Sequence, residues 1–388
     1  MKSILAFALI FSLNSFAQQQ QKTGLIYDRE TGAPVEFADV YDAFDLTYSN
    51  ADGRYLLVAA SDSVTFKKIG YESQTLAISS IPDTVYLNQR LFELEEVVLT
   101  NLKTLWDRVG DSLRANYTLS SYKERFFIRC LLRKNGELIR VQDVAGKLKR
   151  RTLFYNKEME IEKKDFEFEV EHMRKLGIEK DENDVYFRFF SLSQLFLESV
   201  RLNATGPGFE ITERSFEGQP MAKIFFQSDP SAPRINSNGH YLINKANKAI
   251  ESVVIHSEID SDRYFKNGPI RSRTVKRDQV VHFHESMKTG KYYLNLAKLR
   301  FDIEITSTKK DFKDLYTCEY TIQTYDNGQD LEVKPNANAR KDLFKLKFPF
   351  EQAFWEQQHF LPLTNEIEAF IEAMGKANKT FKIRSNLK

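Results

Sequence analysis

Short runs of apolar residues, separated by turn residues, occupy the first hundred positions of the chain. Turns are indicated at Thr31-Gly32 and at Asn50-Ala51-Asp52-Gly53. Because no helical periodicity intervenes, this spacing favours a β-sandwich over residues 18–100. The expected strands are Gly24–Asp28, Pro34–Val40, Arg54–Val58, Val64–Ile69, Thr84–Leu87 and Val97–Leu99.

Three later segments repeat apolar residues at three- and four-residue steps, which indicates helices. The middle one opens with Ser191 and has Gln194 three positions on, the spacing of a capping box. The last one has Asn365 as its expected N-cap, with Glu368 three positions on, and it is expected to end at Gly375. The helices are expected near 101–116, 191–203 and 366–375.

Strand patterning returns between these helices. Phe166–Val170 and Leu299–Ile305 alternate apolar with charged residues, as expected of strands with one buried face. The whole chain is therefore predicted to be mainly β, with a larger antiparallel α+β region over residues 101–388. Its other expected strands are Arg125–Leu132, Ala222–Gln227, His240–Asn244, Ile250–Ile259, Ile270–Glu285, Lys291–Thr306 and Leu315–Tyr325.

A set of residues in the first region follows the order of a known motif. The set is Gly24, Asp28, Thr31-Gly32, Pro34, Ala38, Val40, Asp52-Gly53, Tyr55, Gly70-Tyr71-Glu72 and Leu94-Glu95-Glu96-Val97-Val98. In this order the residues resemble the carboxypeptidase-regulatory-like domain, which is similar to the N-terminal extension of many TonB-dependent transporters. The resemblance implies a transthyretin-like β-sandwich that serves interaction or folding. It does not imply peptidase activity, because in those proteins the chemistry lies in another domain.

The larger region carries a weaker resemblance. The order of its strands and helices resembles the open half-barrel of lipoprotein carriers. From Asn116-Tyr117 to Phe354-Trp355 it is also similar to uncharacterised Gram-negative envelope proteins that carry the same regulatory-like domain. No activity follows from this resemblance.

The first seventeen residues have the pattern of an export signal. Lys2 precedes the apolar run Ile4–Leu13, and Ser15 and Ala17 are the small residues that a signal peptidase requires, so cleavage is expected between Ala17 and Gln18. The expected location is the periplasm or the outer membrane. Lys and Arg (56) nearly balance Asp and Glu (54), which together with export argues against a nucleic-acid partner.

The chain has two cysteines, Cys130 and Cys318. In an oxidising compartment they could form a disulfide that closes a long loop. Two separate buried thiols explain them equally well, because cysteine packs as a small apolar residue. The two alternatives stay open at the level of sequence.

One spacing suggests a metal site. His282 and Glu285 match the HxxE of zinc carboxypeptidases, with His284 between them and His359 as the third ligand that would be required. In an antiparallel strand, however, His282 and His284 point to one face and Glu285 to the other. A structural or surface role for these histidines is therefore favoured, and no metal or other cofactor is expected.

Two SxxK strings, Ser120–Lys123 and Ser307–Lys310, resemble the nucleophile motif of penicillin-binding proteins. Lys288-Thr289-Gly290 and Tyr325-Asp326-Asn327 resemble two further elements of that family. The serine of such an enzyme opens a buried helix, so that the lysine lies one turn on. Here Ser120 leads into an expected strand and Lys288–Gly290 lies in an expected turn, which favours coincidence.

Two basic clusters, Lys147–Arg151 and Arg271–Arg277, could contact lipid phosphates or an acidic partner, or could be charged strand edges exposed to solvent. Together the patterns predict an exported, non-catalytic envelope protein that acts as an interaction or ligand-binding module. Its expected partner is another envelope protein or an outer-membrane component. A hydrolase, either a zinc peptidase or a serine acyl-enzyme, and a carrier of lipid or another apolar ligand are the alternatives.

Overall fold

The computed structural model describes residues 20–43, 45–90, 104–155, 159–201, 208–215, 220–229, 235–260, 262–286, 288–325, 331–358, 360–376 and 382–387. The fold is mainly β, as the alternating patterns predicted. The expected cleavage site Ala17-Gln18, the expected strand Val97–Leu99 and His359 lie outside the described residues. The chain divides into two compact units, of which the first contains residues 1–91 and 357–368 and the second the remainder.

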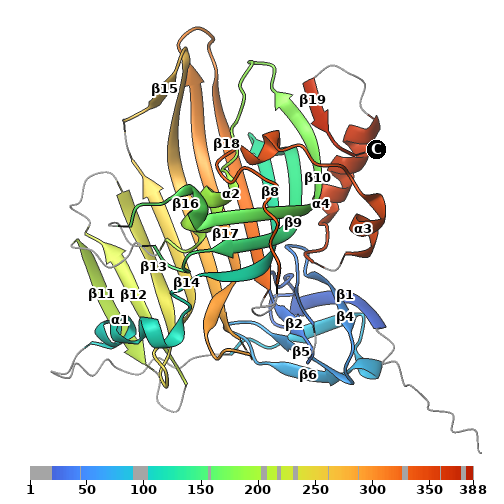
Figure 1. The fold of residues 1–388 in the computed structure, drawn as a ribbon, viewed down its shortest axis with the longest axis vertical. Helices are drawn as coiled ribbons and strands as arrows, with labels where there is room; N and C mark the ends of the chain where they lie inside the picture. Colours follow the sequence, from blue (N-terminus) through green and yellow to red (C-terminus); the bar gives the residue numbers. More distant parts are fainter. Residues whose placement is uncertain are drawn as a thin grey trace, which may run out of the picture. The chain divides into compact units, whose positions relative to one another are not determined.

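Two small sheets form the first unit (Figure 1). Their facing side chains, among them Ile26, Val40, Leu57, Phe66 and Val85, make one buried core. The first sheet has the order β4 (Arg54–Ala59), β1 (Gln20–Asp28), β7 (Thr84–Leu87). The second has the order β3 (Leu46–Tyr48), β2 (Asp39–Tyr41), β5 (Ser63–Lys67), β6 (Gln74–Ala77), followed by the 3-10 turn η1 (Ile78–Ser80).

The prediction of a strand over Pro34–Val40 is largely wrong. Only its last two residues belong to β2, while Pro34 makes a single bridge to Tyr27. Phe37 has a φ of 55°, a left-handed conformation that interrupts an extended chain. Strands β3 and β6 were not predicted, whereas β7 was predicted to the residue.

Asp28 accepts hydrogen bonds from several residues of the first unit, two of which, Thr31 and Tyr71, belong to the motif of the first region. Its Oδ1 accepts hydrogen bonds from the backbone N–H groups of Glu30 and Thr31, both at 2.8 Å. Its Oδ2 accepts from the Tyr71 hydroxyl at 2.8 Å and from the Gln89 amide at 2.5 Å. These donors, led by the Thr31 N–H, hold the pKa of Asp28 well below its usual range.

The C-terminal segment 357–368 packs with the first unit, although the predicted division at residue 100 placed it in the second region. Asn50 Nδ2 donates to Leu363 O at 3.0 Å, and Thr47 Oγ1 donates to Phe360 O at 3.0 Å. Arg54 Nη2 donates to Asn365 Oδ1 at 2.6 Å. Hydrogen bonds between positions so far apart in the chain leave no local pattern, which is why the sequence did not reveal them.

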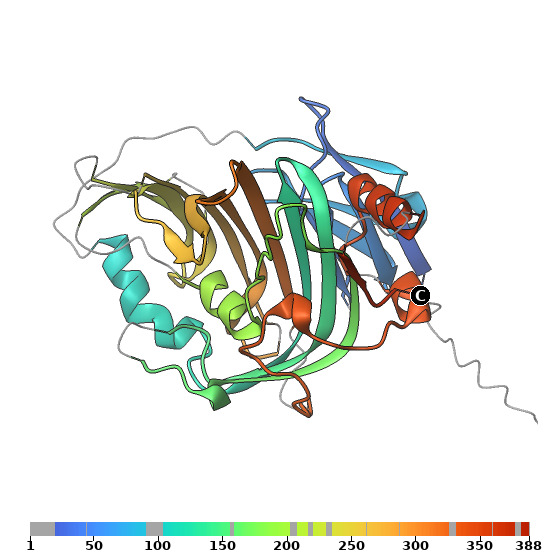
Figure 2. The same ribbon diagram turned by 90° about the horizontal axis from the view of Figure 1, so that it is seen from above.

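A twelve-stranded antiparallel sheet forms the second unit. Its order is β11-β12-β13-β14-β16-β17-β18-β8-β9-β10-β19, with β15 paired to β16. Figure 2 shows the sheet curving around α2 (Leu192–Ser199). The strands are β8 (Tyr122–Lys134), β9 (Glu137–Arg150), β10 (Phe166–Lys180), β11 (Phe209–Ser215), β12 (Met221–Ser228), β13 (Ile235–Asn244), β14 (Ile250–Ile259), β15 (Phe265–Asn267), β16 (Ile270–Glu285), β17 (Tyr292–Ser307), β18 (Lys313–Tyr325) and β19 (Lys382–Ser385).

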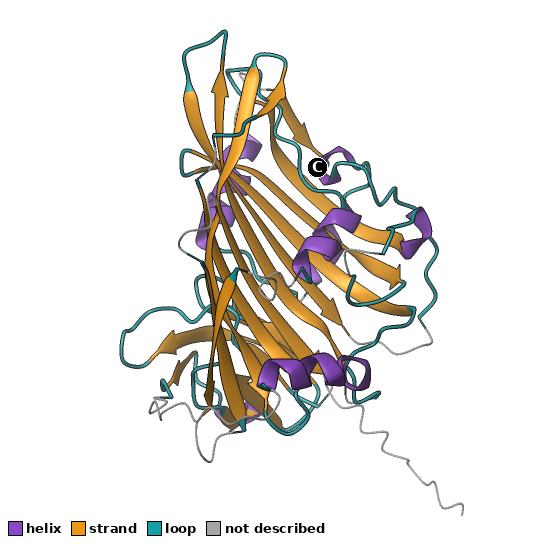
Figure 3. Cartoon of the chain, turned by 90° about the vertical axis from the view of Figure 1, so that its left-hand side faces the viewer, coloured by secondary structure: helices purple, strands orange, loops and turns teal. Residues whose placement is uncertain are grey.

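The helices α1 (Leu105–Asn116) and α2 lie within the segments predicted to be helical. The helices of the chain are coloured purple in Figure 3. Helix α1 starts later than predicted because Thr104 caps it, and α2 has the expected Ser191–Gln194 capping box but ends at Ser199 rather than 203. Helix α4 (Asn365–Lys376) starts one residue early, since Thr364 Oγ1 accepts from Ile367 N. The remaining elements are η2 (Lys163–Asp165), η3 (Leu343–Lys345) and α3 (Gln352–Gln357).

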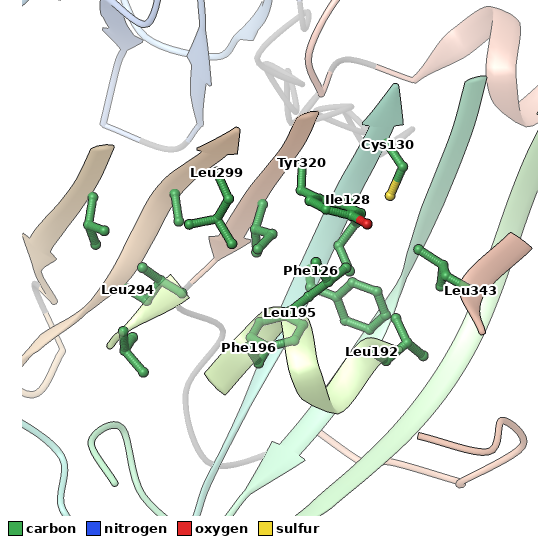
Figure 4. Close-up of a cluster of buried hydrophobic side chains, with 14 of the residues drawn as sticks. Phe126, Ile128, Cys130, Leu192, Leu195, Phe196, Leu294, Leu299, Tyr320 and Leu343 are labelled. Carbon is green, nitrogen blue, oxygen red and sulfur yellow. The ribbon is translucent and has the colours of Figure 1, made fainter. Parts of the chain in front are cut away.

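The concave face of the sheet is packed with side chains (Figure 4). Leu192, Leu195 and Phe196 of α2 are fully buried in one core with residues of the strands. Phe196 contacts Phe126 and Phe168 at centroid distances of 5.8 and 5.6 Å. The amphipathic stripe of α2 therefore covers the sheet, as its periodicity predicted.

Strand β9 was missed because its interior is polar as well as buried. Arg140, Gln142 and Asp143 are at most 1% exposed, so both faces of the strand are covered. An apolar–polar alternation arises only where one face meets solvent. Strands β11, β15 and β19 were missed too.

None of the helices in the described part of the chain has both the length and the hydropathy that a membrane span requires.

Candidate functional site

The residues of the HxxE spacing, for which a structural or surface role was favoured, lie near the end of β16. Phe283 is buried in the core, while the flanking His282 and His284 are half-buried and Glu285 is exposed. Within the described residues, no group of three or more histidine, cysteine or acidic side chains is placed to hold a metal ion. The fourth residue of this hypothesis, His359, lies outside the described part.

The two cysteines are diagonal neighbours on paired strands. Cys130 of β8 faces Tyr320 of β18, and Cys318 faces Leu132. Both are buried and both are free thiols, so the disulfide alternative is not realised. Diagonal positions are about 7–8 Å apart, whereas the Cα atoms of a disulfide usually lie within about 7 Å. Burial raises the pKa of both thiols, which leaves them unreactive.

A pocket of about 690 Å³ lies where the chain passes from α1 into β8. Segments far apart in the sequence line it: the C-terminal end of α1, the loop before β8, the first residues of β8 and the β16–β17 hairpin. Most of the lining side chains carry a hydroxyl group or a positive charge. They include Arg114, Ser120, Ser121, Lys123, Thr289 and Tyr293.

Some lining residues hold the wall of the pocket. Tyr117 Oη donates to Ile250 O and accepts from Ile250 N, both at 2.7 Å, which fixes the end of α1 against β14. Lys291 Nζ donates to Arg114 O at 2.9 Å and so bonds to the last turn of α1. Ser286 Oγ accepts from the N–H groups of Lys288 and Thr289 and shapes the hairpin turn.

Other lining residues are available to a ligand. Among the described residues, the side chains of Arg114, Ser120, Ser121 and Lys123 make no hydrogen bond or ion pair with another protein group. They offer two hydroxyl groups and two positive charges to the pocket. Such unsatisfied polar groups at a concave surface are typical of a site that orients a polar ligand.

The electrostatics of the pocket favour an anion. Arg114, Lys123 and Lys291 line it with positive charge, and Glu124 is the one acidic residue of the lining. Glu124 is buried, and its Oε1 lies 3.6 Å from Arg150 Nη1, so an internal cation offsets its charge. Burial raises the pKa of the Tyr122 hydroxyl well above its usual value, which keeps this group neutral.

The structure brings together two of the penicillin-binding-like strings that the sequence analysis treated as coincidence. Ser120 and Lys123 line the pocket together with Thr289 of the Lys288–Gly290 string. Ser120 precedes a strand, however, and does not open a helix, as expected. The second SxxK string, Ser307–Lys310, lies at the far end of β17, and of Tyr325-Asp326-Asn327 only Tyr325 is described.

The basic cluster Lys147–Arg151 is engaged in ion pairs along β9 and β10. Lys147 pairs with Glu169 and Lys149 with Glu167, at 3.2 and 3.0 Å. The side chain of Arg150 is fully buried and donates to Thr152 O and Leu153 O. This cluster therefore stabilises the sheet. The cluster Arg271–Arg277 is only partly paired and is considered below.

The sequence had drawn attention to the Ser120–Lys123 and Lys288–Gly290 strings, but as coincidental matches and not as parts of one pocket. Arg114, Tyr293 and the hairpin residues Ser286, Thr289 and Lys291 come from segments that are distant along the chain. Only the pairing of β16 with β17 and the docking of α1 bring them together. No spacing along the chain could have signalled this.

Comparison with known proteins identifies no relative of this chain. The chain matches no protein-family model, and no curated protein matches it. The resemblance of the first region to the carboxypeptidase-regulatory-like domain therefore stays a prediction.

Proposed function

We propose that the protein is an exported, non-catalytic binding protein of the cell envelope whose ligand occupies the pocket at the start of β8. The observation that supports this proposal is a concave site of about 690 Å³ whose lining includes Arg114, Ser120, Ser121 and Lys123, side chains that no other described residue engages. A volume of this size accommodates a small molecule or one end of a larger one. The first unit would then serve as the interaction module that the resemblance implies.

The ligand would be a small anion that carries hydroxyl groups. Arg114 and Lys123 would bind its negative charge, and Ser120 and Ser121 would exchange hydrogen bonds with its hydroxyl groups. The ring of Tyr293 would offer a face for packing.

Titration calorimetry with three sugars tests the proposal: glucuronate, glucose 6-phosphate and neutral glucose. We expect the two anions to bind and glucose to bind at least tenfold more weakly. Lys123→Ala should weaken binding of the anions by about tenfold or more, since a charged hydrogen bond contributes about 1.5–3 kcal/mol. Lys288→Ala is the matched control, because Lys288 is an exposed lysine on the β16–β17 hairpin, next to the lining residue Thr289 but outside the pocket lining.

Failure of both anions to bind at millimolar concentration would contradict the proposed ligand class. Equal loss of affinity in Lys123→Ala and Lys288→Ala would contradict the proposed site. Export is tested separately, by the N-terminal sequence of the mature protein: the proposal requires it to begin at Gln18.

A serine acyl-enzyme is the second candidate, and one observation favours it: Ser120, Lys123 and Thr289 line the same pocket. In that reaction Lys123 would accept the proton of the Ser120 hydroxyl as its oxygen attacks a carbonyl carbon. Labelling with a fluorescent penicillin, with Ser120→Ala as the control, distinguishes the two candidates. If the protein is labelled and the label is lost in Ser120→Ala, the protein is a serine acyl-enzyme and the proposal of a non-catalytic binding protein is wrong.

A further inference from the structure

Two hairpin ends meet at one end of the twelve-stranded sheet and form a surface we call the basic tip, residues 263–273 and 307–313 (Figure 1). The first end is the β15–β16 hairpin, which turns at Gly268-Pro269. The second is the turn between β17 and β18. Thr308 N donates to Pro269 O at 2.9 Å, so the two ends are bonded to each other.

An exposed aromatic ring occupies this tip. Phe265 is 73% exposed, more than the other large apolar residues that reach the described surface. A single exposed apolar residue needs no explanation, but this ring lies at the end of a hairpin among cations. Its position therefore has to be considered together with the surrounding charge.

The tip is strongly basic in a chain whose charges nearly balance. Its two segments contain seven Lys and Arg residues and one acidic residue, Asp311. Asp262 immediately precedes the tip and is exposed. Two of the cations, Arg273 and Lys313, pair with Glu304. Within the described residues Lys266, Arg271, Lys309 and Lys310 are exposed and make no ion pair.

Two of these cations face each other directly. Lys266 of β15 and Arg271 of β16 are partners in the antiparallel register. Like charges at directly opposite positions repel and destabilise the strand pair. The turn that carries Lys309 and Lys310 is held by Ser307 Oγ, which accepts from both of their N–H groups at 3.1 and 3.2 Å. The backbone of the tip thus places these cations at neighbouring positions, and an anionic surface would relieve the repulsion between Lys266 and Arg271.

We propose that the basic tip docks on the surface of a bilayer that contains anionic phospholipid. The cations would lie at the level of the headgroup phosphates, and the ring of Phe265 would enter the boundary between headgroups and acyl chains. A soluble acidic partner would satisfy the charges but would leave the projecting ring without an apolar environment. This inference is independent of the ligand of the pocket.

Co-sedimentation of the mature chain with vesicles tests the proposal. We expect binding to phosphatidylcholine vesicles with 30% phosphatidylglycerol and little binding to phosphatidylcholine alone. Each cation should contribute about fivefold in affinity, so Lys266→Ser with Arg271→Ser should reduce binding about 20- to 30-fold. Phe265→Ser should reduce it about tenfold, and rising salt should weaken it.

Matched substitutions elsewhere serve as controls. Lys163→Ser with Lys164→Ser removes two exposed cations from η2, and Ile235→Ser removes another exposed apolar side chain. Both should leave vesicle binding unchanged. In Phe265→Trp, vesicles should shift the emission of the new tryptophan to shorter wavelength, after subtraction of the signal of Trp106 and Trp355.

Three results would overturn the inference. The first is no binding to the anionic vesicles. The second is binding that the control substitutions reduce as much as the tip substitutions do. The third is equally tight binding to soluble polyphosphate together with no effect of Phe265→Ser, which would assign the tip to a soluble polyanion.

Discussion

In the first unit, the polar residues of the sequence motif are engaged within the protein, whereas in the second unit the polar residues at the pocket face open space. Asp28 accepts four hydrogen bonds from its own unit. Ser120, Ser121 and Lys123 have no such partners among the described residues. The motif of the first unit therefore serves folding, whereas the polar side chains at the pocket are available for binding.

The same contrast exists inside the second unit. Asp143 is fully buried and accepts from Arg129 Nε at 2.9 Å and from Arg174 Nη2 at 2.6 Å. Burial alone would raise the pKa of Asp143, but the two guanidinium charges lower it. Charge in this unit thus has two roles: paired charge inside the sheet stabilises it, and unpaired charge at the pocket and the tip is available to partners.

The largest expected effect concerns this buried charge. Asp143→Ala should lower the free energy of unfolding by about 3–5 kcal/mol, because it leaves two buried guanidinium groups without a counter-charge. Tryptophan fluorescence during urea unfolding checks it, since Trp106 and Trp355 both lie in the second unit. Glu332→Ala, which breaks an exposed pair with Lys334, should cost at most about 1 kcal/mol.

A smaller effect is expected at a turn of the first unit. Gly53 has a φ of 75°, and a Cβ there would lie 2.5 Å from Ile26 O. Gly53→Ala should therefore destabilise the first unit by about 1–3 kcal/mol, measured by hydrogen exchange of β1 and β4. In Gly32→Ala, where φ is 66° but no atom is close, about 1 kcal/mol is expected. Equal effects would show that packing at Gly53 is unimportant.

Acid should loosen the first unit through Asp28. Because its folded-state pKa is lowered, its stabilising contribution is complete above the unfolded value of about 4 and is lost as the pH falls below that value. Hydrogen exchange of β1 and β7, corrected for intrinsic rates, should show less protection at pH 3 than at pH 6. Asp28→Asn should be less protected at pH 6 and change less between the two values.

The smallest effect is expected at the pocket. Ser121→Ala and Lys123→Ala should each change the free energy of unfolding by no more than about 0.5 kcal/mol, because neither side chain bonds to the described part of the protein. Urea unfolding measures this. If either variant lowers the free energy of unfolding by about 2 kcal/mol or more, these side chains stabilise the fold. The polar residues of the two units would then not differ in role.

Local patterns were sufficient for much of the fold. The capping box at Ser191–Gln194 and the apolar stripe of α2 predicted the helix that fills the concave face. Alternation predicted β10 and β17, each of which has one face in the core. In each case the physical cause acts within one element, through capping or through burial of one face.

The sequence by itself determined the mainly β class, the positions of α1 and α2, and helix α4 to within one residue at each end. Only the tertiary structure decided that segment 357–368 joins the first unit, that β9 is buried on both faces, and that the β16–β17 hairpin closes the pocket. Contacts between distant segments depend on strand register and packing. Neither leaves a period or a spacing along the chain.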